Sequence, residues 1–133
     1  MNKLNSTSDN KVLVALDVSS TSQKNLNIGH QLVSMLLNSK RSVVLCLFDT
    51  LVRSEIEVNL SNLKLCFSKI NAASVGGTDF NSVLAHAQKN NYKNVTIISD
   101  GLASDPFKKE LNLNWILTNG DQNHLSWGNK TLA

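Results

Sequence analysis

The stretch KVLVALDVSST (residues 11–21) begins with an almost unbroken apolar run and ends in an aspartate followed by hydroxyl side chains. A short, continuous apolar run is typical of a strand buried on both faces of a parallel sheet. From Gln23 to Asn38 the apolar residues recur at helical spacing, which predicts a helix after the polar loop. A buried strand, a loop and a helix in this order indicate the start of an α/β fold.

The rest of the chain repeats this alternation. Residues 80–90 keep helical spacing, and residues 61–70 do so more weakly. An alternating polar and apolar pattern predicts a half-exposed edge strand at 54–60, and the tail beyond Gly120 has room for another short edge strand. Three further apolar runs predict buried strands, at 42–49, 94–100 and 113–118. The pattern predicts a Rossmann-like, mostly parallel sheet with helices on both faces and one antiparallel edge strand.

Size and composition indicate one domain. The chain has 133 residues, of which 1–10 form a polar N-terminal tail and 11–133 the predicted domain. Cys46 and Cys66 are too few for a disulfide framework, and no charged-then-apolar leader opens the chain. No apolar stretch reaches the roughly 18 residues of a membrane span. We therefore expect a cytoplasmic protein with reduced thiols and no membrane contact.

The basic side chains are scattered along the chain. The formal net charge is only +3, and the lysines are spread rather than gathered in one segment. A dispersed pattern is typical of a solvated surface, whereas nucleic-acid binding calls for a basic stripe. The charge pattern therefore disfavours a nucleic-acid partner.

Polar residues follow the predicted strands at their carboxyl ends, where ligands bind in sheets of this kind. Three segments converge there: DVSST (17–21), GGTD (76–79) and SDG (99–101). Each alone has an ordinary explanation as a helix cap or a turn. Together they bring five oxygen side chains to one edge, those of Asp17, Ser19, Thr21, Thr78 and Asp100. An all-oxygen set without His or Cys suits a hard cation, Mg²⁺ (or Mn²⁺).

The charge of such a site suggests what it binds. Two carboxylates neutralise a divalent ion, and the remaining ligands are neutral hydroxyls and water. The metal then favours a further anionic ligand from outside. An Asp or Glu of a protein partner would serve, which makes the site a metal-bridged docking point.

These segments resemble a known family. Asp17-x-Ser19-x-Thr21, Thr78 and Asp100 are similar in kind and order to the metal-ion-dependent adhesion site (MIDAS) of von Willebrand factor A (VWA) domains. More narrowly, the chain resembles the VWA-like domain of bacterial metallopeptidase-type proteins, and the Ro ribonucleoprotein carries a related GGTD loop. The segments with the narrower likeness are GGTDF (76–80), ISDG (98–101), LNWILTNG (113–120) and a late WG.

The resemblance implies roles for individual residues. Ser19, Thr21 and Thr78 correspond to the hydroxyl ligands of the metal. Asp17 and Asp100 correspond to the carboxylates that bind it directly or through water. Asp79 is expected to cap the following helix or to support the ligands from behind, and Ser99 is assigned the same supporting role.

The chain also departs from the family. Thr21 stands where the family usually has Ser, the C-terminal helix is missing, and the loops around the site are short. His30, His86 and His124 form no H-E-x-x-H arrangement, so proteolysis is not expected here. We predict a binding module without enzymatic activity, whose partner is a protein, with an ATPase or protease subunit as one candidate.

Two alternatives remain open at this point. The segment CLFDTLVRS (46–54) resembles the phosphatase motif of the haloacid dehalogenase family, with Asp49 as nucleophile. That motif needs a second Asp two residues later, and Leu51 stands there. The Ro likeness suggests RNA binding instead, but the weak, scattered charge does not support it strongly. Trp115 is expected in the core, and Trp127 either covers the sheet or stays exposed for a partner.

Overall fold

A six-stranded sheet runs through the described part of the chain, which in this computed structural model comprises residues 10–19, 23–70 and 77–133. The strand order is β3-β2-β1-β4-β5-β6, and β3 is antiparallel to β2 while all other neighbours are parallel. The strands are β1 (Lys11–Asp17), β2 (Ser42–Phe48), β3 (Val52–Val58), β4 (Asn94–Ser99), β5 (Asn112–Leu117) and β6 (Asn129–Leu132). The helices are α2 (Gln23–Asn38), α3 (Leu63–Ser68) and α4 (Phe80–Lys89). The predicted fold class is confirmed.

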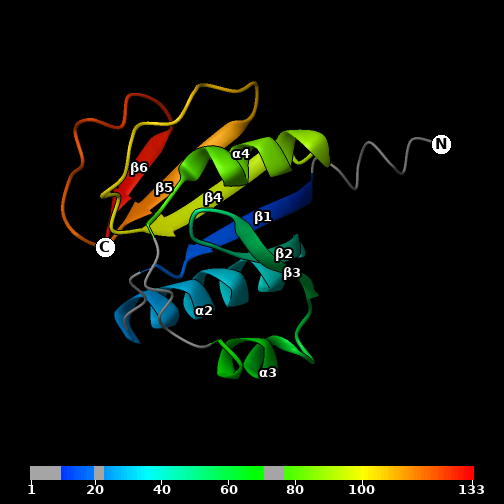
Figure 1. Ribbon diagram of the computed structural model, residues 1–133. Coiled ribbons are helices and arrows are strands. Elements are labelled where there is room, and N and C mark those ends of the chain that lie inside the picture. Colours follow the sequence, from blue (N-terminus) through cyan, green and yellow to red (C-terminus); the bar gives the residue numbers. More distant parts are fainter. Residues whose placement is uncertain (1–9, 20–22, 71–76) are drawn as a thin grey trace.

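Strand β1 is central because its side chains are apolar on both faces. It pairs with β2 on one side and with β4 on the other. Leu13 and Ala15 belong to the core under α4, and Val14 and Leu16 belong to the core under α2. Figure 1 shows α4 on one side of the sheet and α2 and α3 on the other. The apolar run that predicted a doubly covered strand is therefore buried as expected.

Helix α2 packs closely on one face of the sheet because it carries a glycine, Gly29, at the contact. A Cβ added at Gly29 would lie 3.2 Å from the Phe67 ring of α3 and 3.6 Å from Ile98 of β4. The absence of a side chain lets the helix approach both. On the opposite face, Phe80 of α4 packs edge-on against Trp115 of β5, with the ring centroids 4.8 Å apart.

Side-chain hydrogen bonds set the strand ends that the sequence pattern placed differently. We predicted strands at 42–49 and 54–60, whereas β2 ends at Phe48 and β3 covers Val52–Val58. The Asp49 carboxylate accepts the Leu51 amide at 3.1 Å, and this turn starts β3 early. The Asn59 side chain accepts the amides of Ser61 and Asn62 in the next turn, which ends β3 at Val58. The spacing of apolar residues alone does not predict these turns.

The segment after β5 covers the α4 side of the sheet. The Trp115 indole donates to the Trp127 carbonyl at 2.8 Å, and the Trp127 indole donates to the Pro106 carbonyl at 3.0 Å. Leu125 is buried in the same core. Gly128 has φ +93, and a Cβ there would lie 2.8 Å from Trp115 Nε1. Trp127 therefore covers the sheet, which decides between the two positions expected for it.

Helix α4 is tied to the edge strand β3 through one carboxylate. Glu55 of β3 contacts Nε2 of His86, and it accepts a hydrogen bond from Tyr92 Oη at 2.9 Å. Burial raises the pKa of Tyr92 above its ordinary value, and the hydrogen bond and charge of Glu55 raise it further. Burial, aided by Glu55, also raises the pKa of the Cys46 thiol to about 12, so this cysteine stays a neutral core side chain.

We expect these shifts to make the protein less stable at alkaline pH. A raised pKa means that the folded chain holds the Tyr92 proton more tightly than the unfolded chain does. The stabilisation is therefore fully present below the unfolded pKa of about 10 and is lost as the pH rises beyond it. Urea unfolding between about pH 9 and 11 should show this decline, and Tyr92→Phe should make it shallower. Equal slopes for the two proteins would contradict the assignment to Tyr92.

Candidate metal centre

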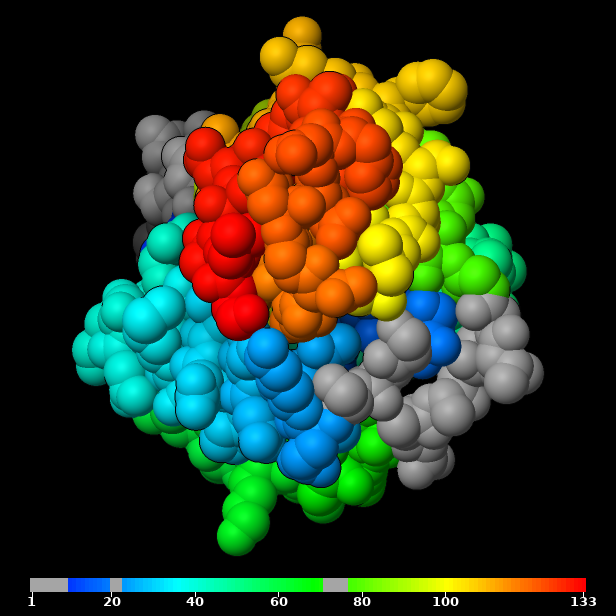
Figure 2. Space-filling model, turned by 90° about the vertical axis from the view of Figure 1, so that its left-hand side faces the viewer, coloured from blue at the N-terminus to red at the C-terminus, as the bar shows by residue number. Residues whose placement is uncertain are grey.

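The fold brings the ends of two neighbouring strands and one loop to the same edge. β1 and β4 are adjacent and parallel, so Asp17 and Ser99 end their strands side by side. The loop that enters α4 carries Thr78 to the same place. Figure 2 looks onto this edge, where the blue end of β1 lies beside the yellow segment that follows β4. The convergence expected from strand order is present.

Asp17 is the centre of the cluster and is almost fully buried, at 1% exposure. Its Oδ1 accepts the Ser19 amide at 3.0 Å and the Ser19 hydroxyl at 2.6 Å. These two bonds join residues two apart, so the loop after β1 turns over the carboxylate as an Asx turn does. The local order Asp-x-Ser thus directs the Ser19 hydroxyl back towards Asp17.

Thr78 completes the contact from a distant part of the chain. Its Oγ1 lies 2.6 Å from Ser19 Oγ and 3.4 and 3.3 Å from the two carboxylate oxygens of Asp17. The next residue is held in two ways: the Asp79 amide donates to the Asp49 carbonyl at 2.9 Å, and the Asp79 carboxylate accepts the Asn81 amide at 2.9 Å. Asp79 is therefore the N-cap of α4, one of the two roles expected for it.

Ser99 supports Asp17 from behind. Its buried hydroxyl donates to Asp17 Oδ2 at 2.7 Å and accepts the Gly101 amide at 3.0 Å. The neighbouring Asp100 is half-buried, and its Oδ1 accepts the Leu102 amide at 3.0 Å. The structure thus places Ser99 directly against the cluster and Asp100 beside it. The remaining predicted ligand, Thr21, lies outside the described residues.

The oxygen atoms of this cluster lie at hydrogen-bond distances from one another, and these distances overlap the spacing of ligand oxygens around a small cation. An octahedral Mg²⁺ with bonds of about 2.1 Å holds adjacent ligand oxygens about 3 Å apart. The spacings among Asp17, Ser19 and Thr78 range from 2.6 to 3.4 Å and bracket that value. Nowhere in 10–19, 23–70 or 77–133 do three or more His, Cys, Asp or Glu side chains form a group able to hold a metal. A MIDAS-type set has only two carboxylates and relies on hydroxyls, so its metal ligation stays a prediction.

The turn after β2 is a support that sequence reasoning did not connect with this site. Asp49 is buried, its Oδ1 accepts the Arg53 Nε–H at 2.7 Å, and its carbonyl anchors the Asp79 amide. The sequence singled out Asp49 only as the nucleophile of a phosphatase-like motif, without a link to Asp79. The Arg53 side chain and the Leu51 amide both bind the Asp49 carboxylate, which a phosphatase of the haloacid dehalogenase type would use as nucleophile.

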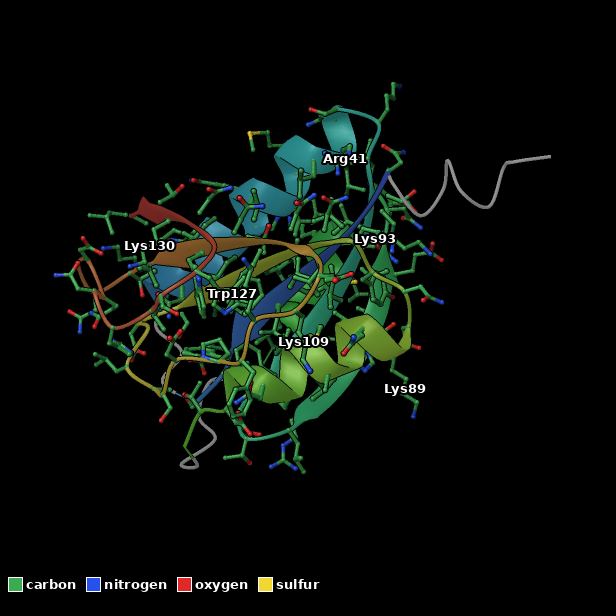
Figure 3. All side chains as sticks on the ribbon, turned by 90° about the horizontal axis from the view of Figure 1, so that it is seen from above. Arg41, Lys89, Lys93, Lys109, Trp127 and Lys130 are labelled. Atoms are coloured by element: carbon green, nitrogen blue, oxygen red, sulfur yellow. The ribbon has the colours of Figure 1, made fainter. Side chains whose placement is uncertain are left out.

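The labelled basic side chains come from separate elements. Figure 3 shows Arg41 beyond the end of α2, Lys130 on β6, and Lys89 and Lys93 around the end of α4. Lys130 donates to the Gln122 carbonyl at 2.9 Å, and Arg41 donates to the Asn10 carbonyl at 3.1 Å. Lys93 and Lys109 line the same pocket, whereas Lys130 belongs to β6, and the nucleic-acid alternative stays a prediction.

Comparison with known proteins supports the fold. No family model matches this chain, and no curated protein matches it. Among solved structures, an aerotolerance-related membrane protein from Bacteroides fragilis NCTC 9343, carrying multiple mutations to serines, is 16% identical over 80% of this chain, with a TM-score of 0.58. The conserved hypothetical protein BatB from Bacteroides thetaiotaomicron is 15% identical over 81%, with a TM-score of 0.59.

The present chain spans 66% of each of these two neighbours, slightly less than two thirds. At this identity the likeness concerns the fold, and it is consistent with a VWA-like fold. No helix among the described residues is long and apolar enough to cross a membrane.

Proposed function

We propose that this chain is a metal-dependent protein-binding module with a MIDAS-type site. Asp17, Ser19, Thr21, Thr78 and Asp100 would hold Mg²⁺ (or Mn²⁺), and a partner protein would supply an Asp or Glu as a further ligand. The observation that carries the proposal is the buried Asp17 carboxylate in contact with hydroxyls from three separate segments. The bound metal would supply positive charge at the surface for an incoming carboxylate.

The side chains of the cluster would have separate roles in metal binding. Ser19 and Thr78 offer neutral oxygens, so they add no charge that would weaken the attraction of the metal for an outside anion. Ser99 orients Asp17, and supporting bonds of this kind usually matter for metal affinity. The Ser19 and Thr78 hydroxyls, which contact Asp17 and each other, each have a lone pair that a cation could use.

The finer parts of the proposal follow from the sequence resemblance. The segments GGTDF, ISDG and LNWILTNG favour the VWA-like domain of bacterial metallopeptidase-type proteins, without a catalytic role for this chain. An ATPase or protease subunit is then a suitable partner. A cytoplasmic location agrees with the two cysteines, both of which are free.

Calorimetric titration with MgCl₂ and MnCl₂ tests the proposal. We expect single-site binding to the wild type in the millimolar range or tighter. Thr78→Val removes the hydroxyl and keeps the shape, so it should weaken binding at least about tenfold, whereas Thr78→Ser should retain it. Circular dichroism would verify that both variants fold. An absence of heat with the wild type at 10 mM metal, or equal affinity for all three proteins, would overturn the metal assignment.

A further inference from the structure

Basic residues gather at the edge of the sheet opposite the candidate metal centre. Strands β1, β2, β4 and β5 are parallel to one another, so their first residues share one edge, which we call the amino edge. Lys11 begins β1, and Arg41 and Lys93 directly precede β2 and β4. Lys109 lies shortly before β5, and Lys89 ends α4. Figure 3 shows Arg41, Lys89 and Lys93 at this end of the molecule. The fold thus brings together basic residues that are scattered along the sequence.

Backbone pairing holds these residues close to one another. The register of β1 and β4 places Lys11 beside Lys93, one position before the first pair of the two strands. The Lys93 carbonyl accepts the Asn112 amide at 2.7 Å, where β5 begins. Lys93 and Lys109 both line a pocket of about 160 Å³ beside the last turn of α4. Three neighbouring strands and one helix therefore contribute to the same small region.

Four of the lysines lie on one side of the sheet. Side chains alternate along a strand, and the residues two positions after Lys11 and Lys93 belong to the core under α4. Both lysines are therefore on the α4 side, where the pocket also lies. Arg41 and Glu57 line a separate pocket on the α2 side. The members on the α4 side, which we call the lysine cluster, are Lys11, Lys89, Lys93 and Lys109.

The positive charge of the lysine cluster is only partly compensated. None of the ion pairs within residues 10–19, 23–70 and 77–133 includes a lysine of the cluster. Glu110 lines the same pocket and offsets one charge. The negative end of the α4 dipole favours Lys89, but it does not account for Lys11 on β1. Like charges on neighbouring strands repel, as those of Lys11 and Lys93 do. An external anion at this position would remove that repulsion.

Carboxylates gather at the opposite edge of the sheet. Asp17 ends β1, Asp49 and Asp100 directly follow β2 and β4, and Asp79 is the N-cap of α4. The two edges therefore differ in charge. The resulting field attracts a polyanion to the amino edge and repels it from the carboxyl edge.

We propose that the lysine cluster binds the phosphate backbone of a single-stranded nucleic acid. Neighbouring strands are about 4.8 Å apart, so the row from β1 through β4 to β5 extends over roughly 10 Å. A narrow row of this kind fits one phosphodiester chain, whereas a duplex presents two chains across a groove about 12 Å wide. Gln88 and Asn91 line the same pocket and offer amide groups to sugars or bases.

The surroundings of the pocket favour nucleic acid over a lipid surface. None of the large exposed apolar side chains of the described residues lines it. Proteins that lie on membranes usually add apolar side chains to their basic ones. Lysine ammonium groups, in contrast, bind phosphates as point charges without apolar support.

Fluorescence anisotropy with a labelled oligothymidylate of about 20 nucleotides, at about 50 mM NaCl, tests this proposal. The cluster variant replaces three neighbouring lysines and is K11Q/K93Q/K109Q. The matched control removes the same charge from exposed lysines of α2 and of α3 with its C-cap, and is K24Q/K64Q/K69Q. Circular dichroism verifies that both variants fold. NMR chemical-shift titration of the labelled wild type locates the contact without any substitution.

We expect the wild type to bind the oligothymidylate with a Kd in the micromolar range. The logarithm of its binding constant should fall with the logarithm of salt concentration with a slope of about −2 to −3, since each neutralised phosphate contributes about 0.7. The cluster variant should bind at least about tenfold more weakly, with a slope shallower by about two. The control should stay within about threefold of the wild type. Amide shifts should centre on Lys11 and Lys93.

Several results would overturn the proposal. Equal weakening in both variants would show that only net charge matters. Equally tight binding of a duplex or of polyglutamate of similar length would remove the preference for a single phosphodiester chain. Binding to phosphatidylserine vesicles without binding to the oligothymidylate would assign the lysine cluster to a lipid surface. Because the metal centre lies at the other edge, Asp17→Asn should leave oligothymidylate binding unchanged, and the two proposals can fail separately.

Discussion

Replacing Asp17 with asparagine should abolish measurable Mg²⁺ binding while the chain still folds. Asn keeps the size of the side chain and one acceptor oxygen, so the Ser19 and Ser99 contacts can reorganise around it. It removes one of the two carboxylates and places an NH₂ group where a cation needs an oxygen lone pair. We expect the affinity to fall at least about a hundredfold, the upper end of what a lost support costs, because Asp17 is a predicted direct ligand.

Thermal unfolding provides a second measurement of the Asp17→Asn effect. A ligand that binds only the folded chain stabilises it by about 2.7 kcal/mol at a concentration of 100 Kd. The wild type should therefore melt at a higher temperature in excess MgCl₂, and Asp17→Asn should lose that increase. Asp121→Asn is the control, since Asp121 is an exposed carboxylate 3.7 Å from Lys130 and outside the cluster. An equal Mg²⁺-dependent increase in all three proteins would show that the ion acts elsewhere.

Replacing Trp115 with alanine should cause the largest loss of stability. Trp115 is fully buried, packs edge-on against Phe80 at 4.8 Å, and donates to the Trp127 carbonyl at 2.8 Å. Alanine would leave a cavity under α4 and remove the donor that holds the segment after β5. We expect the free energy of unfolding to fall by about 4 kcal/mol, as is usual for a buried aromatic truncated to alanine.

Urea unfolding of two further variants separates packing from hydrogen bonding. Trp115→Phe keeps an aromatic ring and loses the indole donor, so it should cost less than Trp115→Ala. Trp127→Ala removes a half-buried ring and should also cost less. A loss below about 1 kcal/mol for Trp115→Ala would mean that this core is not the main source of stability.

Much of the fold was predictable because each element carries its own pattern. The apolar run 11–17 predicted β1 to the residue, and the helical spacing after Gln23 predicted α2 in full. Element ends were less accurate. Helix α3 covers Leu63–Ser68 rather than 61–70, since Asn59 and Asn62 use their side chains to form the preceding turn. Such turns compete with the helix through polar contacts that apolar periodicity does not record.

The candidate site was predictable in part, because strand order places the carboxyl ends of neighbouring strands together. The contacts that make it a cluster involve residues 59 to 82 positions apart, Ser19 with Thr78 and Asp17 with Ser99. Which leucines are exposed was not predictable, since an exposed leucine and a buried one have the same letter in the sequence.

By itself, the sequence determined the elements, their order and the oxygen side chains available at the strand ends, because these depend on local patterns of apolar and polar residues. The tertiary structure alone decided which hydroxyls meet Asp17, that Trp127 covers the sheet, and that Leu51, Leu102 and Phe107 are exposed. Those outcomes depend on distances between segments far apart in the chain, which are set only when the helices and loops pack on the two faces of the sheet.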